Sequence, residues 1–415
     1  MLGEIRIKKT DLYNYHDYDA RKFIKSLINF LGECQVLRSL KKYEQSLKCS
    51  GVLYRDYYLK KRHPWFDALT QYYELVRNAK TIHKNLTPEL QSLAIDAKKV
   101  YEVQRSMPGS IKNKYKRDLL DENRGYNYLF EIEIAWHYLL QDYTLHWYED
   151  DSGKHPEFLV KAPNLSFNVE CKWVSVDIAR KIHRREFYLF AEKLIPEIEK
   201  RKYSGQLNIS LEDRLTSETI NELCPEILKQ IDGGLLQGES KIESFGTLTL
   251  DLHSNSGAFI DFNKHMVDSY KRKADKAHLA VFAGAKHGKA VDPIDLTVMS
   301  EKADTILNEI QKRISEAAKD QLDCSIPGLI VCFLEGVNGF ELCELKSDSG
   351  LQHMTCHVLN KDKYSHIAGV NYSSERMVQK ETGAEEIFNN ALFFRNRKCK
   401  FKEAEKFEFV SRRRL

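Results

Sequence analysis

The amino-acid sequence predicts an α/β protein with a helical N-terminal part, and three observations lead to this fold class. Residues 1–120 carry apolar side chains at helical spacing. Residues 143–177 have the composition of three short strands and directly follow a strong helix. The nearly continuous apolar run at 327–334 is typical of a strand that is buried on both faces.

The N-terminal part is predicted to be an all-helical domain over residues 1–120. Within it, Thr87 and Pro88 are the cap and the first-turn proline of a helix start. This part holds 24 lysines and arginines against 13 aspartates and glutamates, an excess of 11 positive charges, whereas the whole chain carries only +4. We therefore expect a basic surface that serves nucleic-acid docking or dimerisation.

Two basic runs in this part are candidates for nucleic-acid contacts. Residues 54–65 interleave aromatic and basic side chains, so cations can meet phosphates while rings stack on bases. The alternative is a helix with an aromatic core face and a solvated basic face. The residues predicted to contact phosphate are Lys60, Lys61, Arg62, Lys112, Lys114 and Lys116.

Residues 125–141 are predicted to form a strong helix with apolar side chains on more than one side. The helix contains Glu131 and Glu133, which lie on nearly opposite faces at 100° per residue. Glu131 shares its face with Ala135, a small residue that lets a helix approach a sheet closely. This spacing directs Glu131 toward the strands that follow.

The last of the three predicted strands alternates in polarity, so its two faces differ. One face is polar and the other apolar: Asn168, Glu170 and Lys172 on the first, and Phe167, Val169, Cys171 and Trp173 on the second. A strand of this kind can hold a carboxylate and an ammonium side by side above a core face.

The preceding strand begins at Pro156-Glu157, where the missing proline N–H does least harm. Pro163-Asn164 is a turn signal between the two strands. Glu157 and Glu170 are 13 residues apart, a separation that suits neighbouring hairpin strands whose acids come together.

Downstream, residues 178–244 are predicted to be a mostly helical insertion, in which Pro196 breaks or kinks a helix. Strands are expected at 245–252 and 279–282, a long amphipathic helix at 302–322, and the buried strand at 327–334.

The residues Glu131, Pro156-Glu157-Phe158 and Glu170-Cys171-Lys172, in this order of elements, resemble the PD-(D/E)XK nuclease superfamily. The resemblance covers about residues 125–180. It implies a restriction-endonuclease-like fold, in which helices flank a mixed central sheet, over residues 121–415 with the helical insertion at about 178–244.

The resemblance also implies roles. Glu157, Glu170 and the backbone carbonyl of Cys171 would hold Mg²⁺ or Mn²⁺, Lys172 would orient the attacking water, and Glu131 would be an outer or second-metal ligand. The implied activity is divalent-metal-dependent endonuclease cleavage of DNA, and the implied biological role is defence against foreign DNA.

Acid-x-Lys triplets are common, and three others occur, at Asp96–Lys98, Glu239–Lys241 and Glu344–Lys346. The last is the main rival, because it follows a turn and Glu335 can serve as its first acid. The family's first strand acid is usually Asp, whereas this chain has Glu157, and Asp150 and Asp151 are nearby alternatives.

Three other interpretations of these residues stay open. Glu170 and Lys172 can form an ordinary same-face ion pair, worth about 0–1 kcal/mol if exposed. The chain can be a catalytically silent subunit that binds nucleic acid within a larger complex. It can also be a protein-interaction scaffold with a buried ion pair.

Nine cysteines without a C-x-x-C pair indicate reduced thiols and a cytoplasmic protein, not a disulfide framework or zinc knuckle. No apolar run approaches the roughly 18 residues of a membrane span, and the first residues lack the apolar stretch of a signal peptide. DNA is the expected partner, no membrane is expected, and a homodimer or a partner subunit is left open.

Overall fold

The computed structural model describes residues 5–7, 17–148, 155–257, 259–262, 264–265, 268–269, 278–286, 289–337, 342, 345, 349–374, 377–381, 384–389 and 391–409. The chain divides into two compact units. Unit 1 comprises Met1–Ser46, Arg62–Val176 and Ile306–Leu415, and unit 2 comprises Leu47–Lys61 and Asp177–Thr305. The predicted boundary at residue 120 falls inside unit 1, and the predicted insertion at 178–244 falls inside unit 2.

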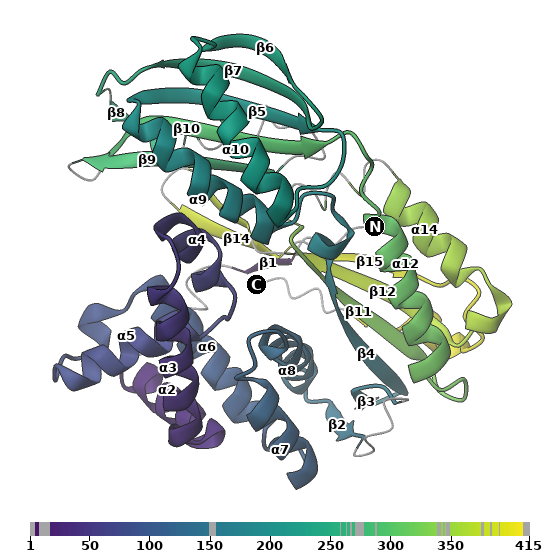
Figure 1. Ribbon diagram of the computed structural model, residues 1–415. Coiled ribbons are helices and arrows are strands. Elements are labelled where there is room, and N and C mark those ends of the chain that lie inside the picture. The colour runs from purple at the N-terminus through teal and green to yellow at the C-terminus, as the bar shows by residue number, and fades with distance from the viewer. Residues whose placement is uncertain are drawn as a thin grey trace. The chain divides into compact units, whose positions relative to one another are not determined.

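Helices make up most of the N-terminal part, as predicted (Figure 1). Those assigned largely to unit 1 are α2 (Asp17–Leu31), α3 (Glu33–Lys48), α5 (Phe66–Arg77), α6 (Pro88–Val103) and α7 (Gly109–Asp118). The predicted cap of α6 is confirmed, because the Thr87 hydroxyl accepts the Leu90 N–H at 3.3 Å and Pro88 is the first helical residue. The part is not entirely helical: the alternating Ile5–Ile7 forms strand β1, which pairs antiparallel with β14 (Ala384–Asn389).

Unit 1 contains a mixed six-stranded sheet, which confirms the predicted α/β class. The strand order is β15-β12-β11-β4-β3-β2. The bounds are β2 Thr144–Trp147, β3 Phe158–Ala162, β4 Leu165–Ser175, β11 Gly328–Glu335, β12 Ile367–Ser374 and β15 Ala391–Arg395. The predicted apolar strand is β11, which runs parallel to both β4 and β12 and is buried along most of its length.

Helices cover both faces of this sheet (Figure 1). On one face lies α8 (Gly125–Leu139), whose Phe130 ring packs against Trp173 and Phe333. On the other face, α12 (Ile306–Glu316), a π-helical turn at Ala317–Gln321 and α14 (Gly350–Leu359) enclose a separate core. The predicted helix at 302–322 is therefore shorter and ends in that turn.

Unit 2 has its own six-stranded mixed sheet, in the order β6-β7-β5-β10-β8, with β9 also paired to β10. The bounds are β5 Tyr203–Leu211, β6 Gln237–Ile242, β7 Gly246–Ser254, β8 Phe259–Ile260, β9 His278–Lys286 and β10 Lys289–Ser300. Two strands, β5 and β6, lie within the stretch predicted to be a helical insertion. The polar-apolar alternation of β5, with Leu207 and Ile209 in the core, accounts for its strand structure.

The helices of unit 2 are α4 (Val52–Tyr57), α9 (Arg184–Lys200) and α10 (Ser217–Asp232). Pro196 lies inside α9 and does not end it, because Leu194, Ile195 and Ile198 around it are fully buried in the core. Tertiary burial thus outweighs the hydrogen bond that proline removes.

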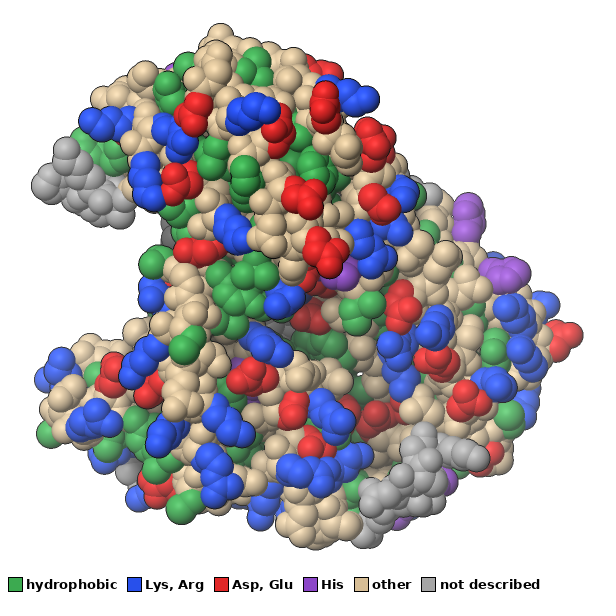
Figure 2. Space-filling view, in the orientation of Figure 1, with side chains coloured by type: hydrophobic (Ala, Val, Ile, Leu, Met, Phe, Trp, Pro, Cys, Tyr) green, Lys and Arg blue, Asp and Glu red, His purple; other side chains and the backbone are tan. Residues whose placement is uncertain are grey.

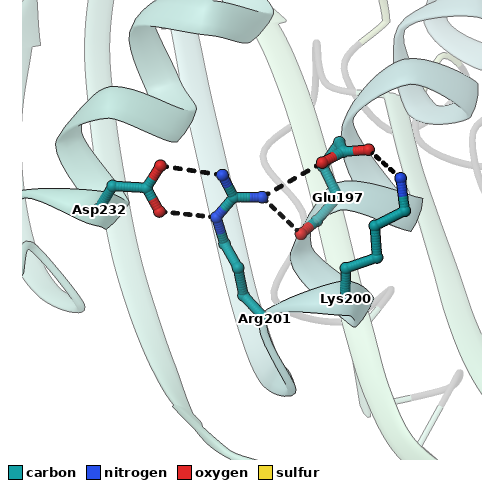
Figure 3. A network of polar contacts seen from close by, with 4 residues as sticks. All are labelled: Glu197, Lys200, Arg201 and Asp232. Carbon is teal, nitrogen blue, oxygen red and sulfur yellow. Dashed lines mark hydrogen bonds and ion pairs between the residues drawn. The ribbon is translucent and has the colours of Figure 1, made fainter.

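A charged network closes the C-terminal ends of α9 and α10 (Figure 3). Arg201 donates two hydrogen bonds to Asp232, at 2.7 and 2.8 Å, and one to the Glu197 carbonyl at 2.9 Å. Lys200 contacts the Glu197 carboxylate. The guanidinium thereby links the end of α9 to the end of α10.

None of the described helices is both long enough and apolar enough to cross a membrane.

Candidate active site

The predicted acids lie where β3 and β4 part. The antiparallel register pairs Phe158 with Val169, and continuing it by one residue sets Glu157 opposite Glu170. The Glu157 N–H donates to the Val169 carbonyl at 3.2 Å. From Glu170 onward, β4 pairs only with β11 among the described residues, so one edge of β4 is open there.

The carboxyl groups of Glu157 and Glu170 are neighbours. Glu157 Oε2 accepts the Cys171 N–H at 3.2 Å, which turns its carboxyl toward β4. The two carboxyls are close enough to share a hydrogen bond when one of them is protonated. Burial, followed by the charge of Glu157, raises the pKa of Glu170 well above its usual value.

Lys172 forms a buried ion pair with Glu170. Its Nζ contacts Glu170 Oε1, and the side chains of Glu170 and Lys172 are 0% and 18% exposed. Burial alone lowers the pKa of the Lys172 ammonium, but the charges of Glu170 and Glu157 outweigh burial and raise it. The two residues thus form the same-face ion pair of the simplest alternative, but Glu170 is buried, so the small free energy of an exposed pair does not apply.

Helix α8, which packs on the Trp173 face of the sheet, brings Glu131 near enough to Glu157 and Lys172 for their charges to act on it. Burial, then the charge of Glu157, raises the pKa of Glu131 to about 8. The charges of Lys114 and Lys172 act on Glu131 in the opposite direction. Glu133 faces elsewhere and pairs with Lys99 at 3.7 Å, as its place on the helix predicts.

Tyr115 is a site residue that the sequence pattern does not single out. It lies on α7, is 3% exposed, and its hydroxyl contacts Glu131 Oε2. The rings of Tyr128 and Trp147 meet it edge-on, with centroids at 4.9 and 5.7 Å. A tyrosine 16 positions before Glu131 on another helix has no local motif that could reveal this contact.

Cys171 is 6% exposed, which agrees with a thiol turned into the core. Burial, with the charges of Glu157, Glu131 and Glu170, raises the pKa of this thiol well above its usual value. The thiol is thus held in its neutral form, and only the backbone of Cys171 is suited to metal binding.

The donor set fits a hard divalent cation. Glu170 Oε2 is buried and has no hydrogen-bond partner among the described residues, and a second carboxyl lies beside it. The described part of the chain holds no group of three or more His, Cys, Asp or Glu side chains arranged for a metal. Mg²⁺ is commonly held by only one or two carboxylates together with water and substrate phosphate, so Glu157 and Glu170 suffice.

The basic run at 60–62 is partly neutralised. Lys60 pairs with Asp56 at 3.1 Å in unit 2. In unit 1, Arg62 pairs with Glu122 at 3.2 Å and donates to the Asn123 amide oxygen at 2.8 Å. Lys61 is exposed. The ring of Tyr57, in the same run, packs against Tyr188 at 5.8 Å. Packing therefore uses at least one aromatic ring of this run.

The second basic run lies on α7, in the same unit as the acids. Lys114 is exposed, lies 5.7 Å from the Tyr128 ring centroid and acts electrostatically on Glu131. Lys116 lies 5.5 Å from the Phe30 ring centroid, and both it and Lys112 are partly exposed. In the face shown in Figure 2, Lys and Arg side chains are interspersed with Asp and Glu side chains.

Of the alternative site residues, the structure describes only Glu335. Glu335 ends β11 and accepts the Trp173 indole N–H at 3.0 Å. Glu344, Lys346, Asp150 and Asp151 lie outside the described residues.

Comparison of the chain with protein-family models, with curated proteins and with solved structures found no match.

Proposed function

We propose that this protein is a divalent-metal-dependent endonuclease that hydrolyses DNA phosphodiester bonds. One observation carries the proposal: two adjacent carboxyls, Glu157 and Glu170, and the Lys172 ammonium meet at the open edge of β4, with one buried carboxylate oxygen left unpartnered among the described residues. Such a cluster is costly in the absence of a ligand, and clusters of this kind are typical of functional sites.

The residues divide the work by their chemistry. Glu157, Glu170 and the Cys171 carbonyl would hold the cation, which when bound supplies Lewis-acid polarisation of the phosphoryl oxygen and acidifies a bound water. Lys172, kept charged by its acidic neighbours, donates hydrogen bonds that orient the attacking water. Glu131 and Lys114 frame the site from α8 and α7, where Lys114 can meet a substrate phosphate.

The order of elements supports a restriction-endonuclease-like core. Helix α8 precedes the antiparallel β2-β3-β4 meander, and a crossover then leads through α12 to the parallel strand β11. A role in defence against foreign DNA is part of the same proposal.

The test compares three purified proteins: wild type, Lys172→Ala and a matched control, Lys161→Ala. Lys161 is an exposed lysine on β3, opposite Thr144 and Ser166 and outside the acid cluster. Each protein is incubated with plasmid, linear duplex and single-stranded DNA and with RNA, in Mg²⁺, Mn²⁺ or EDTA. We expect metal-dependent DNA cleavage by wild type and control, reduced at least ~100-fold in Lys172→Ala.

Cleavage that survives Lys172→Ala would assign the activity to other residues and overturn this site. Salt-sensitive binding without cleavage would support the second candidate, a silent nucleic-acid-binding subunit, which the substitution of Glu157 for the usual Asp favours. Absence of both binding and cleavage on every substrate would overturn both and leave the scaffold interpretation.

A further inference from the structure

The sheet of unit 2 has two chemically different faces. Helices α9 and α10 lie together on one face (Figure 1), where strand residues such as Leu207, Leu248 and Leu296 form the core. The opposite face holds a cavity of about 300 Å³ whose described lining is mostly polar and uncharged. That volume is at the lower limit of ligand pockets and suits a single small ring system with a substituent. The register sets Asp251, Glu239 and Lys241 on the same face beside this lining.

Strand register arranges the polar side chains in rows. Asn208 on β5 pairs with Thr249 on β7 on one side and with Thr297 on β10 on the other. The next row pairs Ser210 with Thr247 and Met299 in the same way. Neighbours in a row are about 4.8 Å apart and successive rows roughly 6.6 Å apart, so the groups form a fixed grid.

Most of these polar side chains make no hydrogen bond to another described side chain or backbone group. Gln206, Asn208, Thr249 and Thr297 have no side-chain hydrogen-bond partner among the described residues. Their carboxamide and hydroxyl groups each donate and accept, so together they offer both kinds of contact to one ligand.

The described lining of the cavity suits an uncharged group better than an anionic one. No Lys, Arg or His side chain is among its described lining residues. The one lining carboxylate among them, Asp295, is 4% exposed and is held at one end by His265 at 2.7 Å and Ser269 at 2.6 Å. Leu279, opposite Thr297, and Met299 add an apolar patch at the other end.

We propose that this cavity binds a nucleobase, either as a free nucleoside or as an unpaired base of a nucleic acid. A nucleobase has a polar edge of alternating donors and acceptors and apolar ring faces. Gln206 and Asn208 match the edge, since carboxamides form paired hydrogen bonds with bases. Leu279 and Met299 match a ring face. This inference does not depend on the proposed cleavage site, which lies in unit 1.

The test is isothermal titration calorimetry on the full chain in EDTA, so that no cleavage occurs. The ligands are adenosine, guanosine, cytidine, thymidine, a short single-stranded oligonucleotide, the same sequence as a duplex, and glucose as an uncharged polar competitor. We expect at least one nucleoside or the single strand to bind with a Kd below about 1 mM, and glucose to bind at least tenfold more weakly; the duplex shows how much of the oligonucleotide binding is due to the DNA backbone.

Two substitutions remove the grid without touching the core: Asn208→Leu and Thr249→Val. The matched control is Asn255→Leu, an exposed asparagine of the same unit outside the cavity. We expect the double variant to lose affinity at least tenfold and the control to stay within twofold. Hydrogen exchange of β5 and β7 in the wild type, with and without each nucleoside, gives a readout that does not require the variants to fold.

Binding of free nucleosides supports a small-molecule ligand, and binding of the single strand alone supports an unpaired base of a nucleic acid. Glucose binding in place of nucleosides, binding that survives the double variant, or no binding by any ligand would each overturn the proposal. None of these measurements depends on DNA cleavage. A failure of the proposed endonuclease function can therefore be distinguished from a failure of the proposed nucleobase binding.

Discussion

The hydroxyl of Tyr115 on α7 donates a hydrogen bond to the carboxylate of Glu131 on α8. Tyr115 is buried on the inner face of α7, while Lys114 beside it is exposed. The same helix therefore supports the acid cluster from inside and presents a cation outside. This relationship makes α7 part of the candidate site, although its sequence shows only a basic run.

Removing that hydroxyl tests its role in positioning Glu131. We expect Tyr115→Phe to leave the fold intact but to raise the Mg²⁺ concentration for half-maximal cleavage several-fold, because Glu131 loses the donor that fixes it. Titration of cleavage against Mg²⁺ measures the effect. The matched control is Tyr73→Phe, since the buried Tyr73 hydroxyl has no hydrogen-bond partner among the described residues. Equal metal dependence of the two variants would contradict the positioning role.

Neutralising one of the clustered acids is expected to separate stability from activity. Glu157→Gln removes the like charge beside the buried Glu170, so we expect the metal-free protein to gain about 1 kcal/mol, or roughly 2–4 °C in Tm. Cleavage is expected to be lost. Differential scanning calorimetry in EDTA measures the gain, and the control is Glu316→Gln, at a half-exposed position of α12 where the carboxylate pairs with Arg313 at 3.7 Å. A lower Tm for Glu157→Gln would show that the two acids do not repel in the folded protein.

The lysines of α7 predict a change in the salt dependence of DNA binding. Replacing Lys112, Lys114 and Lys116 by Gln is expected to weaken DNA binding. The slope of log K against log salt should become shallower by up to roughly 0.9 for each phosphate that these lysines no longer neutralise. Fluorescence anisotropy at several salt concentrations measures the slope. The control replaces three exposed lysines of unit 2 by Gln: Lys202, Lys229 and Lys241. An unchanged slope for the α7 variant would remove this helix from the nucleic-acid surface.

His63 predicts a loss of stability in mild acid. Its ring is 3% exposed, stacks on Phe66 with centroids 3.7 Å apart, bonds the Leu119 carbonyl at 2.9 Å and accepts the Trp65 N–H at 3.2 Å. Burial lowers the pKa of His63 from 6.5 to about 4. Below pH 6.5 the unfolded chain therefore binds a proton at His63, whereas the folded chain stays unprotonated there until about pH 4. The free energy of unfolding falls from pH 6.5 toward pH 4 as a result.

Across this pH range, protonation of His63 in the unfolded chain lowers the free energy of unfolding by about 3 kcal/mol in total, at roughly 1.4 kcal/mol for each pKa unit. We expect His63→Gln, whose carboxamide can make both hydrogen bonds, to be less stable at pH 7 but to have a flatter pH profile between about 6.5 and 4. Urea unfolding across this range, compared between the two proteins, isolates the histidine from other titrating groups. Parallel profiles would contradict the assignment.

Much of the candidate site could be predicted because its signals are local. The 13-residue separation of Glu157 and Glu170 is a hairpin property, and the alternation in β4 sets Glu170 and Lys172 on one face. The continuous apolar run of β11 likewise reflects its two covered faces. Their local residue spacing therefore makes these features visible in the sequence.

The remaining features depend on distant parts of the chain. Tyr115 meets Glu131 through the packing of two helices, which no spacing rule specifies. Unit 2 combines residues 47–61 with residues 177–305. Its strands β5 and β6 lie in a stretch predicted to be mostly helical. Pro196 does not end α9, because buried neighbours outweigh its local effect. Tertiary packing decides the Tyr115 contact and the course of α9, whereas the alternation of β5 is a local signal.

The open edge of β4 has a further consequence, for self-association. A strand edge without a neighbour offers unpaired N–H and C=O groups to any other strand, and such edges promote aggregation unless they are protected. On β4 the Glu157 carboxyl accepts the Cys171 N–H, and the charged side chains of Glu170 and Lys172 flank it, an arrangement that opposes docking of a foreign apolar strand. The residues proposed for catalysis would then also keep the protein monodisperse, and substitutions that make this edge apolar would shorten its lifetime in solution.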